Sequence, residues 1–166
     1  VRRDIDYLED VEEILNILPE KLKDYEKLIT ENPIFIRRTV DKGILDIQTA
    51  LDYAITGVNL RASGICMDNR LQDDLYRGFD IGVVVRDEKD AMARYKARID
   101  EIRESIKIIR QALEVIKSNP NLEQKLINPI NLKLPEGDYH SEIEAPRGLA
   151  GCYIRSLGKN EPYRLK

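Results

Sequence analysis

Residues 87–118 read DEKDAMARYKARIDEIRESIKIIRQALEVIKS, and this stretch decides the fold. Asp87 and Asp90 are typical of a helix start, because a carboxylate there can accept hydrogen bonds from free backbone N–H groups. Apolar residues follow at spacings of three and four without a break, which predicts an amphipathic helix. A helix of about 30 residues is roughly 45 Å long. Its apolar positions are Met92, Tyr95, Ile99, Ile102, Ile106, Ile109, Leu113 and Ile116.

A second helical segment is predicted over residues 1–32, where apolar residues show the same spacing. Pro19 lies inside it and should kink or split the helix, because proline lacks a backbone N–H and its ring clashes with the preceding turn. Asn32-Pro33 is expected to end it. Residues 33–86 are then predicted to hold a short extended stretch over 34–40, a small helix capped by Asp46, irregular loops and a candidate strand at 83–85.

The C-terminal part differs in composition from the helical part. Residues 119–141 contain three prolines and predict a loop, and residues 142–166 show the alternation and turn signals of two or three short strands. The fold class is therefore mainly α (α+β). We expect a single partial domain over 1–166, a helical bundle with a long central helix and a small antiparallel β unit near the C-terminus.

Charge and cysteine content exclude several classes of protein. The 27 basic and 30 acidic residues leave a net charge of -3, which does not favour nucleic acid or direct contact with an anionic membrane. Cys66 and Cys152 stand far apart and form no metal-binding motif, so we expect two reduced, buried thiols. No apolar run reaches the roughly 20 residues of a membrane span. The start at Val1, followed by Arg2 and Arg3, suggests a piece of a longer chain.

Polar residues in three places are candidates for a site. Arg61, Asp68 and Arg70 lie in an aperiodic stretch, where they can either line a polar cavity or form a structural cluster around a buried arginine. Arg94 and Arg98 lie one helical turn apart and could hold an acidic partner. His140, Glu142 and Glu144 alternate as on one face of a strand, which more often indicates a solvated edge than a metal site. No catalytic motif is complete, so we expect no self-contained active site and no bound metal.

Several blocks in order resemble one known family. The chain is similar to the D (49 kDa) subunit of NADH-quinone oxidoreductase, respiratory complex I, within the nickel–iron hydrogenase large-subunit superfamily. The blocks span nearly the whole chain and suggest a middle-to-C-terminal fragment. One departure is Lys89-Asp90, where the family usually has Gly-Asp. The matching blocks are residues 1–4, 25–39, 56–64, Asp68-x-Arg70, 104–113, 144–148 and 162–164.

The resemblance implies a function for the assembled complex rather than for this chain alone. It implies part of a quinone-site-forming subunit, with electron transfer to quinone coupled to ion translocation. Arg147, behind Pro146, matches the Pro-Arg that lies over the metal in the hydrogenases and would be a cavity or interface cation here. The quinone-cavity or interface candidates are Arg147, Pro146, Glu144, Arg61, Asp68 and Arg70.

The resemblance also implies partners, cofactors and a location. The partners would be the iron–sulfur (B-type) subunit and other peripheral-arm subunits, with quinone as ligand and membrane contact only through partner subunits. NADH and iron–sulfur clusters would serve the whole complex, while the isolated fragment would bind no cofactor and be inactive. The location would be the cytoplasmic side of the cell membrane, or the matrix side of the inner membrane in a mitochondrion.

Two alternatives stay open at this point. One is a large-subunit fragment of an energy-converting nickel–iron hydrogenase, which has the same fold. The other is a non-catalytic helical docking domain that only holds partners.

Overall fold

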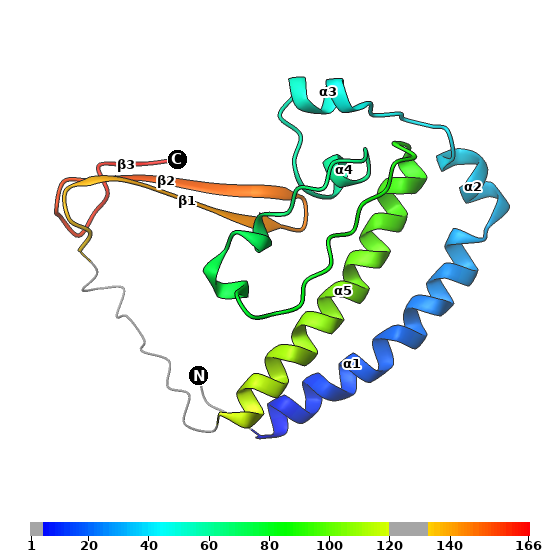
Figure 1. Cartoon of the computed structure of the whole chain (residues 1–166), viewed down its shortest axis with the longest axis horizontal. Helices are drawn as coiled ribbons and strands as arrows, with labels where there is room; N and C mark the ends of the chain where they lie inside the picture. Colours follow the sequence, from blue (N-terminus) through cyan, green and yellow to red (C-terminus); the bar gives the residue numbers. More distant parts are fainter. Residues whose placement is uncertain (1–4, 120–132) are drawn as a thin grey trace.

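The computed structural model describes residues 5–119 and 133–166. Two long helices run side by side as its main body, and a narrow sheet extends away from them (Figure 1). The long helices are α1, Ile5–Tyr25, and α5, Ala91–Ser118. The segments between them include the short helices α2 (Pro33–Thr39), α3 (Ile47–Asp52) and α4 (Gly57–Arg61) and the 3₁₀ turns η2 (Asn69–Leu71) and η3 (Asp74–Tyr76).

Helices α1 and α5 pack through the apolar stripes that their sequences predict. Leu15 and Leu22 of α1 form a buried cluster with Ile106 and Leu113 of α5. Burying a leucine or isoleucine side chain stabilises a fold by roughly 1.5–3 kcal/mol, so this seam is the main apolar contact between the two helices. Ion pairs between α1 and α5, and between the turn after α1 and α5, add to it. They are Glu12–Lys117 at 2.5 Å and Glu26–Arg103 at 2.6 Å.

Helix α5 begins later than its sequence predicts. Its N-cap is Asp90, whose side chain accepts a hydrogen bond from the backbone N–H of Ala93, and the predicted start at Asp87 is wrong. The reason is Lys89, which has a φ of +65° and therefore cannot belong to a right-handed helix. The conformation of Lys89 thus sets where the long helix can start.

Pro19 neither splits α1 nor ends it, contrary to the prediction. The helix runs from Ile5 through Pro19 to Tyr25. Proline at this position leaves the carbonyl of Leu15 without its helical donor, because the bond would come from the residue four places on. Arg110 of α5 supplies a replacement, since its Nη2 donates to the Leu15 carbonyl at 3.2 Å. The helix pairing therefore satisfies the carbonyl that proline leaves free.

The segment after α1 also differs from the prediction. A π-helical turn, η1, occupies Glu26–Thr30, and α2 covers the stretch that the sequence predicts to be extended. Asn32 is the N-cap of α2, with its side chain accepting hydrogen bonds from Ile34 and Phe35, and Pro33 is the first helical residue. Asn-Pro can mark the start of a helix as well as an end, because proline at the first position loses no helical hydrogen bond.

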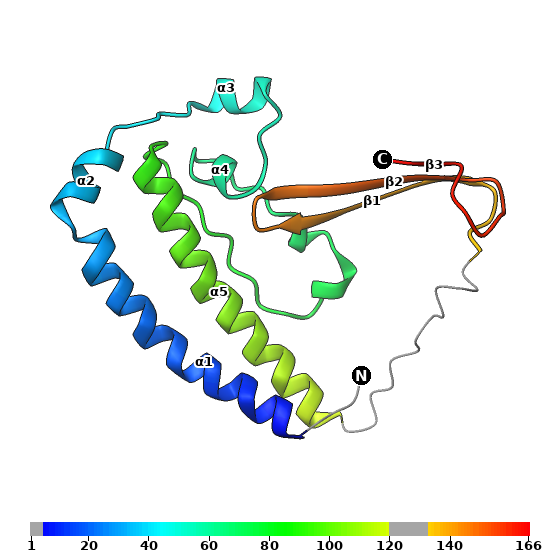
Figure 2. The same cartoon turned by 180° about the vertical axis from the view of Figure 1, so that it is seen from behind.

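The stretch around residues 80–86 is not a strand. It runs alongside α5, as Figure 2 shows, and its backbone bonds to helix side chains instead of a neighbouring strand. The N–H of Asp80 donates to Gln111 Oε1 at 2.8 Å, and the N–H of Gly82 donates to Glu104 Oε1 at 2.5 Å. Helix α3, by contrast, is capped by Asp46 as its sequence predicts.

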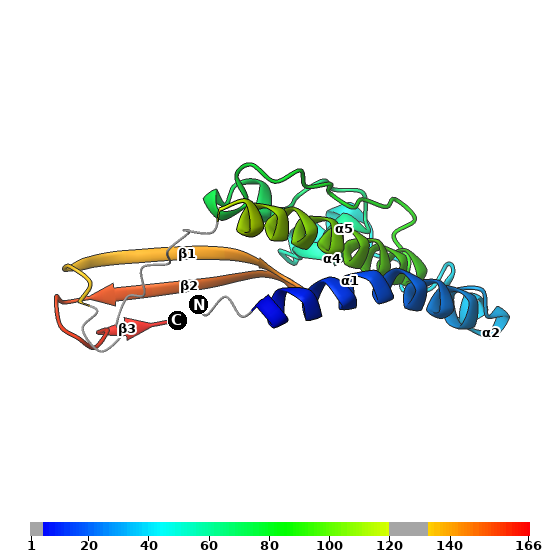
Figure 3. The ribbon, with the colours of Figure 1, turned by 90° about the horizontal axis from the view of Figure 1, so that it is seen from below.

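The sheet is antiparallel, in the order β1-β2-β3, and it projects beyond the helices as an arm (Figure 3). Strand β1 is Gly137–Ala145, β2 is Gly148–Ser156 and β3 is Arg164–Leu165. Strand β1 thus begins inside the predicted loop 119–141, of which residues 120–132 lie outside the described part. Both cysteines are free and exposed, so the prediction of buried thiols is wrong. Within the described residues, no helix is long and apolar enough to cross a membrane.

Candidate functional site

The tip of the β1–β2 hairpin docks on the N-terminus of α4. Gly57 and Gly148 face each other there, and both have positive φ, +66° and +128°. A Cβ on Gly57 would lie 2.4 Å from the Cα of Gly148, so both positions need glycine for this approach. The backbone N–H of Leu149 donates to Thr56 Oγ1 at 2.9 Å. Two sequence blocks about 90 residues apart, 56–64 and 144–148, are therefore in direct contact.

Arg61, the last residue of α4, holds the other side of the hairpin tip. Its side chain is 1% exposed and donates to Glu101 Oε1 on α5, with Nη2 at 2.5 Å, and to Glu144 Oε1 on β1, with Nη1 at 2.8 Å. Nη1 also donates to the carbonyl of Met67 at 2.9 Å. Four of the five N–H donors of this guanidinium are thus used. Arg61 joins α4, α5 and β1 and has almost no capacity left for a ligand.

Asp68 and Arg70 form a second pair beside Arg61. The Asp68 carboxylate is fully buried and lies 2.5 Å from Arg70 Nη2 and 3.8 Å from Arg61 Nη1. Burial raises the pKa of Asp68, but hydrogen bonds from Arg70 and the charges of both arginines outweigh it and lower the pKa. For Arg61, burial lowers the pKa, but hydrogen bonds to Glu144 and Glu101 outweigh it and raise the pKa. Asp68 and Arg61 are therefore both ionised at neutral pH.

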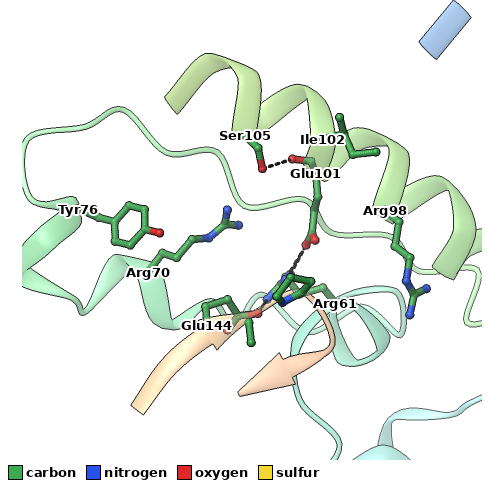
Figure 4. A pocket seen from close by; sticks show the side chains of 10 residues that line it. Arg61, Arg70, Tyr76, Arg98, Glu101, Ile102, Ser105 and Glu144 are labelled. Carbon is green, nitrogen blue, oxygen red and sulfur yellow. Dashed lines mark hydrogen bonds and ion pairs between the residues drawn. The ribbon is translucent and has the colours of Figure 1, made fainter. Parts of the chain in front are cut away.

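A pocket of about 440 Å³ opens beside this cluster, between α5 and the hairpin tip (Figure 4). Arg98 with its partner Asn59, and the pairs around Arg61 and Arg70, make one wall polar. The charges of the three arginines are balanced by Asp68, Glu101 and Glu144, so the pocket has no net charge. Such a mixed lining suits a neutral ligand with polar atoms more than an ion. The lining residues are Arg61, Arg70, Tyr76, Arg98, Glu101, Ile102, Ser105, Glu144, Ala145 and Pro146.

The structure brings five of the six candidate residues together and leaves the sixth on the surface beside them. Arg61, Arg70, Glu144 and Pro146 line the pocket, and Asp68 lies behind Arg70. Arg147 follows Pro146 in the turn and is exposed. Its side chain makes no hydrogen bond or ion pair with the residues that the structure describes.

Sequence reasoning missed several residues of this site. Glu101 and Ser105 look like part of a solvated helix face, and Thr56 looks like an ordinary helix cap. The only signal in the sequence is that Glu101 and Ser105 lie four residues apart, so one helix face presents both. Arg94 and Arg98 hold no acidic partner among the described residues, since Arg94 donates to the carbonyls of Lys89 and Gly43, and Arg98 donates to the Arg94 carbonyl and Asn59.

The other candidate positions do not form a metal site. His140 and Glu142 lie 3.4 Å apart on the exposed part of β1, while Glu144 turns to Arg61. Over residues 5–119 and 133–166, no group of three His, Cys, Asp or Glu side chains is arranged to hold a metal ion. The two exposed cysteines lie on separate segments, in the loop before η2 and on β2. These residues do not fit the ligand set of nickel or of an iron–sulfur cluster, so we assign no metal to this chain.

The fold and the site define a class of protein: a helical component that presents a polar wall and a rigid hairpin tip to something else. The model of the family "Respiratory-chain NADH dehydrogenase, 49 Kd subunit" matches residues 1–131. The chain belongs to this family. The D-type subunit of NADH-quinone oxidoreductase from Bacillus cytotoxicus is 40% identical over 162 residues, which cover 96% of this chain and 44% of that protein.

Two further relatives show the same relation. A D-type subunit of NADH-quinone oxidoreductase from Rhizobium etli is 33% identical over 193 aligned residues, covering 100% of this chain and 48% of that protein. A chain in the structure of the membrane-bound sulfane sulfur reductase, an archaeal respiratory membrane complex, superposes with a TM-score of 0.88 at 34% identity. The match covers 100% of this chain and 46% of that one. The chain therefore spans less than half the length of these relatives.

Proposed function

We propose that this chain forms part of the wall of the quinone site in a membrane-associated NADH-quinone oxidoreductase. The observation that carries the proposal is the docking of the hairpin tip beside the neutral pocket. It fixes Pro146 in the pocket lining and leaves the Arg147 guanidinium exposed, with its donors available. Family membership and the NADH-quinone oxidoreductase relatives support the same function.

The chemistry of quinone reduction fits this arrangement. A quinone is a neutral planar ring, which suits a pocket with apolar residues such as Ile102 and Pro146 and no net charge. It takes up two electrons and two protons to become a quinol, and negative charge develops on its oxygens between these steps. A guanidinium placed at such an oxygen stabilises that charge. We assign this role to Arg147, because Arg61 has already used its donors on Glu101 and Glu144.

The proposal includes partners for the assembled complex. Electrons would come from NADH through iron–sulfur clusters held by other subunits, among them an iron–sulfur (B-type) subunit next to the hairpin tip. Membrane contact would be through partner subunits, on the cytoplasmic side of the cell membrane or the matrix side of a mitochondrial inner membrane. The chain by itself would be inactive, because it provides one wall of a site and no electron donor.

A second acceptor follows from the similarity to the sulfane sulfur reductase chain, which extends over the whole of this chain. In that case the same pocket wall would serve a complex that reduces sulfane sulfur. A hydrogenase role predicts nickel and hydrogen uptake in the purified complex. A docking role predicts that substitutions at the hairpin tip affect assembly alone.

The test is Arg147→Ala in the assembled membrane complex, with Arg155→Ala as the matched control. Arg155 is an exposed arginine on the same hairpin, at the end of β2 away from the tip. We expect Arg147→Ala to lower kcat/KM for a short-chain ubiquinone by about 10- to 100-fold, the effect of one lost charged hydrogen bond, and Arg155→Ala to leave it unchanged. Normal quinone reduction by an Arg147→Ala complex that assembles poorly would favour the docking role. Reduction of polysulfide but not quinone by the unmodified complex would favour the second acceptor.

A further inference from the structure

Thr56 stands at the N-cap of α4 but does not cap it. Threonine at this position ordinarily accepts a hydrogen bond from a backbone N–H of the first helical turn. Here the Thr56 side chain makes no such bond. Its Oγ1 instead accepts from the backbone N–H of Leu149, 2.9 Å away on the hairpin. The hydroxyl is thus used to hold another part of the chain.

The two ends of α4 hold the two sides of the hairpin tip. Thr56, before the helix, bonds to Leu149, and Arg61, at its end, bonds to Glu144 at 2.8 Å. The turn that carries Arg147 lies between these two attachments. Residue 149 is two positions after Arg147, and residue 144 is three positions before it, so neither side of the turn can shift without breaking a bond.

The backbone contact beside Thr56 leaves no room for alternative positions. A Cβ on Gly148 would lie 2.7 Å from Thr56 Oγ1 and 3.3 Å from its carbonyl oxygen. Gly148 is buried in this contact and is the residue directly after Arg147. Thr56 therefore fixes the backbone one residue away from the arginine.

We propose that Thr56 is a positioning residue, which orients Arg147 toward the electron acceptor through its bond to Leu149. This inference rests on the proposed function, in which Arg147 contacts the acceptor. It differs from the role of Arg61, which joins three elements through buried ion pairs and whose loss would disturb the whole cluster. Thr56 contributes one neutral hydrogen bond, so its effect on the arginine can be separated from folding.

The experiment is a double-mutant cycle in the assembled membrane complex, with kcat and KM measured for a short-chain ubiquinone. Thr56→Val removes the acceptor oxygen, and we expect kcat/KM to fall by about 3- to 10-fold, as for one lost hydrogen bond. Thr56→Ser keeps the hydroxyl and should recover most of that loss. Thr39→Val is the matched control, because the Thr39 hydroxyl bonds only within α2, to the Phe35 carbonyl at 2.7 Å, and it should leave the kinetics unchanged.

The decisive comparison is the same Thr56→Val change in an Arg147→Ala background. If Thr56 acts through Arg147, the second substitution should add no further loss. An equal loss in both backgrounds would overturn the positioning role while leaving the role of Arg147 intact. If Arg147→Ala alone has no effect, the proposed function fails, whatever Thr56→Val does.

Assembly is measured alongside activity, as the yield of intact complex. Thr56→Ala is the second variant, because it removes the acceptor without placing a methyl group against the N–H of Leu149. If both Thr56→Val and Thr56→Ala prevent assembly, Thr56 is a structural residue and the positioning role is overturned.

Discussion

Replacing Lys89 by glycine should stabilise the protein. Lys89 has a φ of +65°, a conformation that costs an L-residue with a Cβ roughly 1–2 kcal/mol. Its backbone cannot relax easily, because its N–H donates to the Ala62 carbonyl at 3.1 Å and its carbonyl accepts from Leu45 N at 2.9 Å. Glycine removes the strain but adds about 0.4–1 kcal/mol of chain entropy to the unfolded state. We expect a net gain of about 0.5–1 kcal/mol in the free energy of unfolding.

The assay is denaturant and thermal unfolding of the purified chain, followed by circular dichroism at helical wavelengths. The expected gain corresponds to a rise of about 1–4 °C in Tm for a chain of this size. Lys89→Ala is the control, because alanine removes the amine but keeps the Cβ, so it should leave Tm nearly unchanged. The reasoning is refuted if Lys89→Gly is no more stable than the unmodified chain, or if Lys89→Ala stabilises it equally.

Two further predictions concern the site. The pKa of Asp68 is lower in the folded chain than its ordinary 3.8, so its pairing stabilises the fold above a pH of about 4 and this contribution is lost as the pH falls through the folded pKa; Asp68→Asn should therefore flatten the acid limb of a stability–pH curve, and an unchanged slope would contradict the assignment. Gly148→Ala should cost about 2–4 kcal/mol in denaturant unfolding, because its Cβ meets an oxygen at 2.7 Å in a left-handed backbone. Gly151→Ala on the same strand is the control, since its nearest contact is His140 Nε2 at 3.6 Å, and similar losses for both variants would show that the tip contact is not tight.

Local patterns predict the elements that depend on local physics. The long helix follows from apolar spacing, and the capping of α3 follows from Asp46. The errors lie where one local signal has two meanings. Asn32-Pro33 can end one helix or start another, and the choice depends on whether the following residues can pack. The effect of Pro19 depends on Arg110, which is 94 residues from Asn16, the other acceptor of its Nη2.

The site could be predicted only as a set of residue types. Arg61 and Asp68 are equally consistent with a cavity and with a buried cluster, and the structure contains both, with Arg61 in the cluster and also at the pocket wall. What decides this is Glu101 and Glu144, which lie 40 and 83 positions after Arg61. No spacing rule joins residues at such separations. The use of Thr56 is equally non-local, because its partner Leu149 lies 93 positions later.

The arrangement divides two tasks that a single arginine could not combine. A buried guanidinium is tolerated only when its donors are satisfied, and Arg61 meets this condition with Glu101, Glu144 and the Met67 carbonyl. Satisfying those donors makes Arg61 a rigid support but leaves it unable to bind a ligand. Arg147 has the opposite properties, since it is exposed and unpaired within the described part of the chain. An exposed arginine has a flexible side chain, so any orientation toward a ligand must come from its backbone, and the backbone around it is held by Thr56, Gly148 and the Arg61–Glu144 pair.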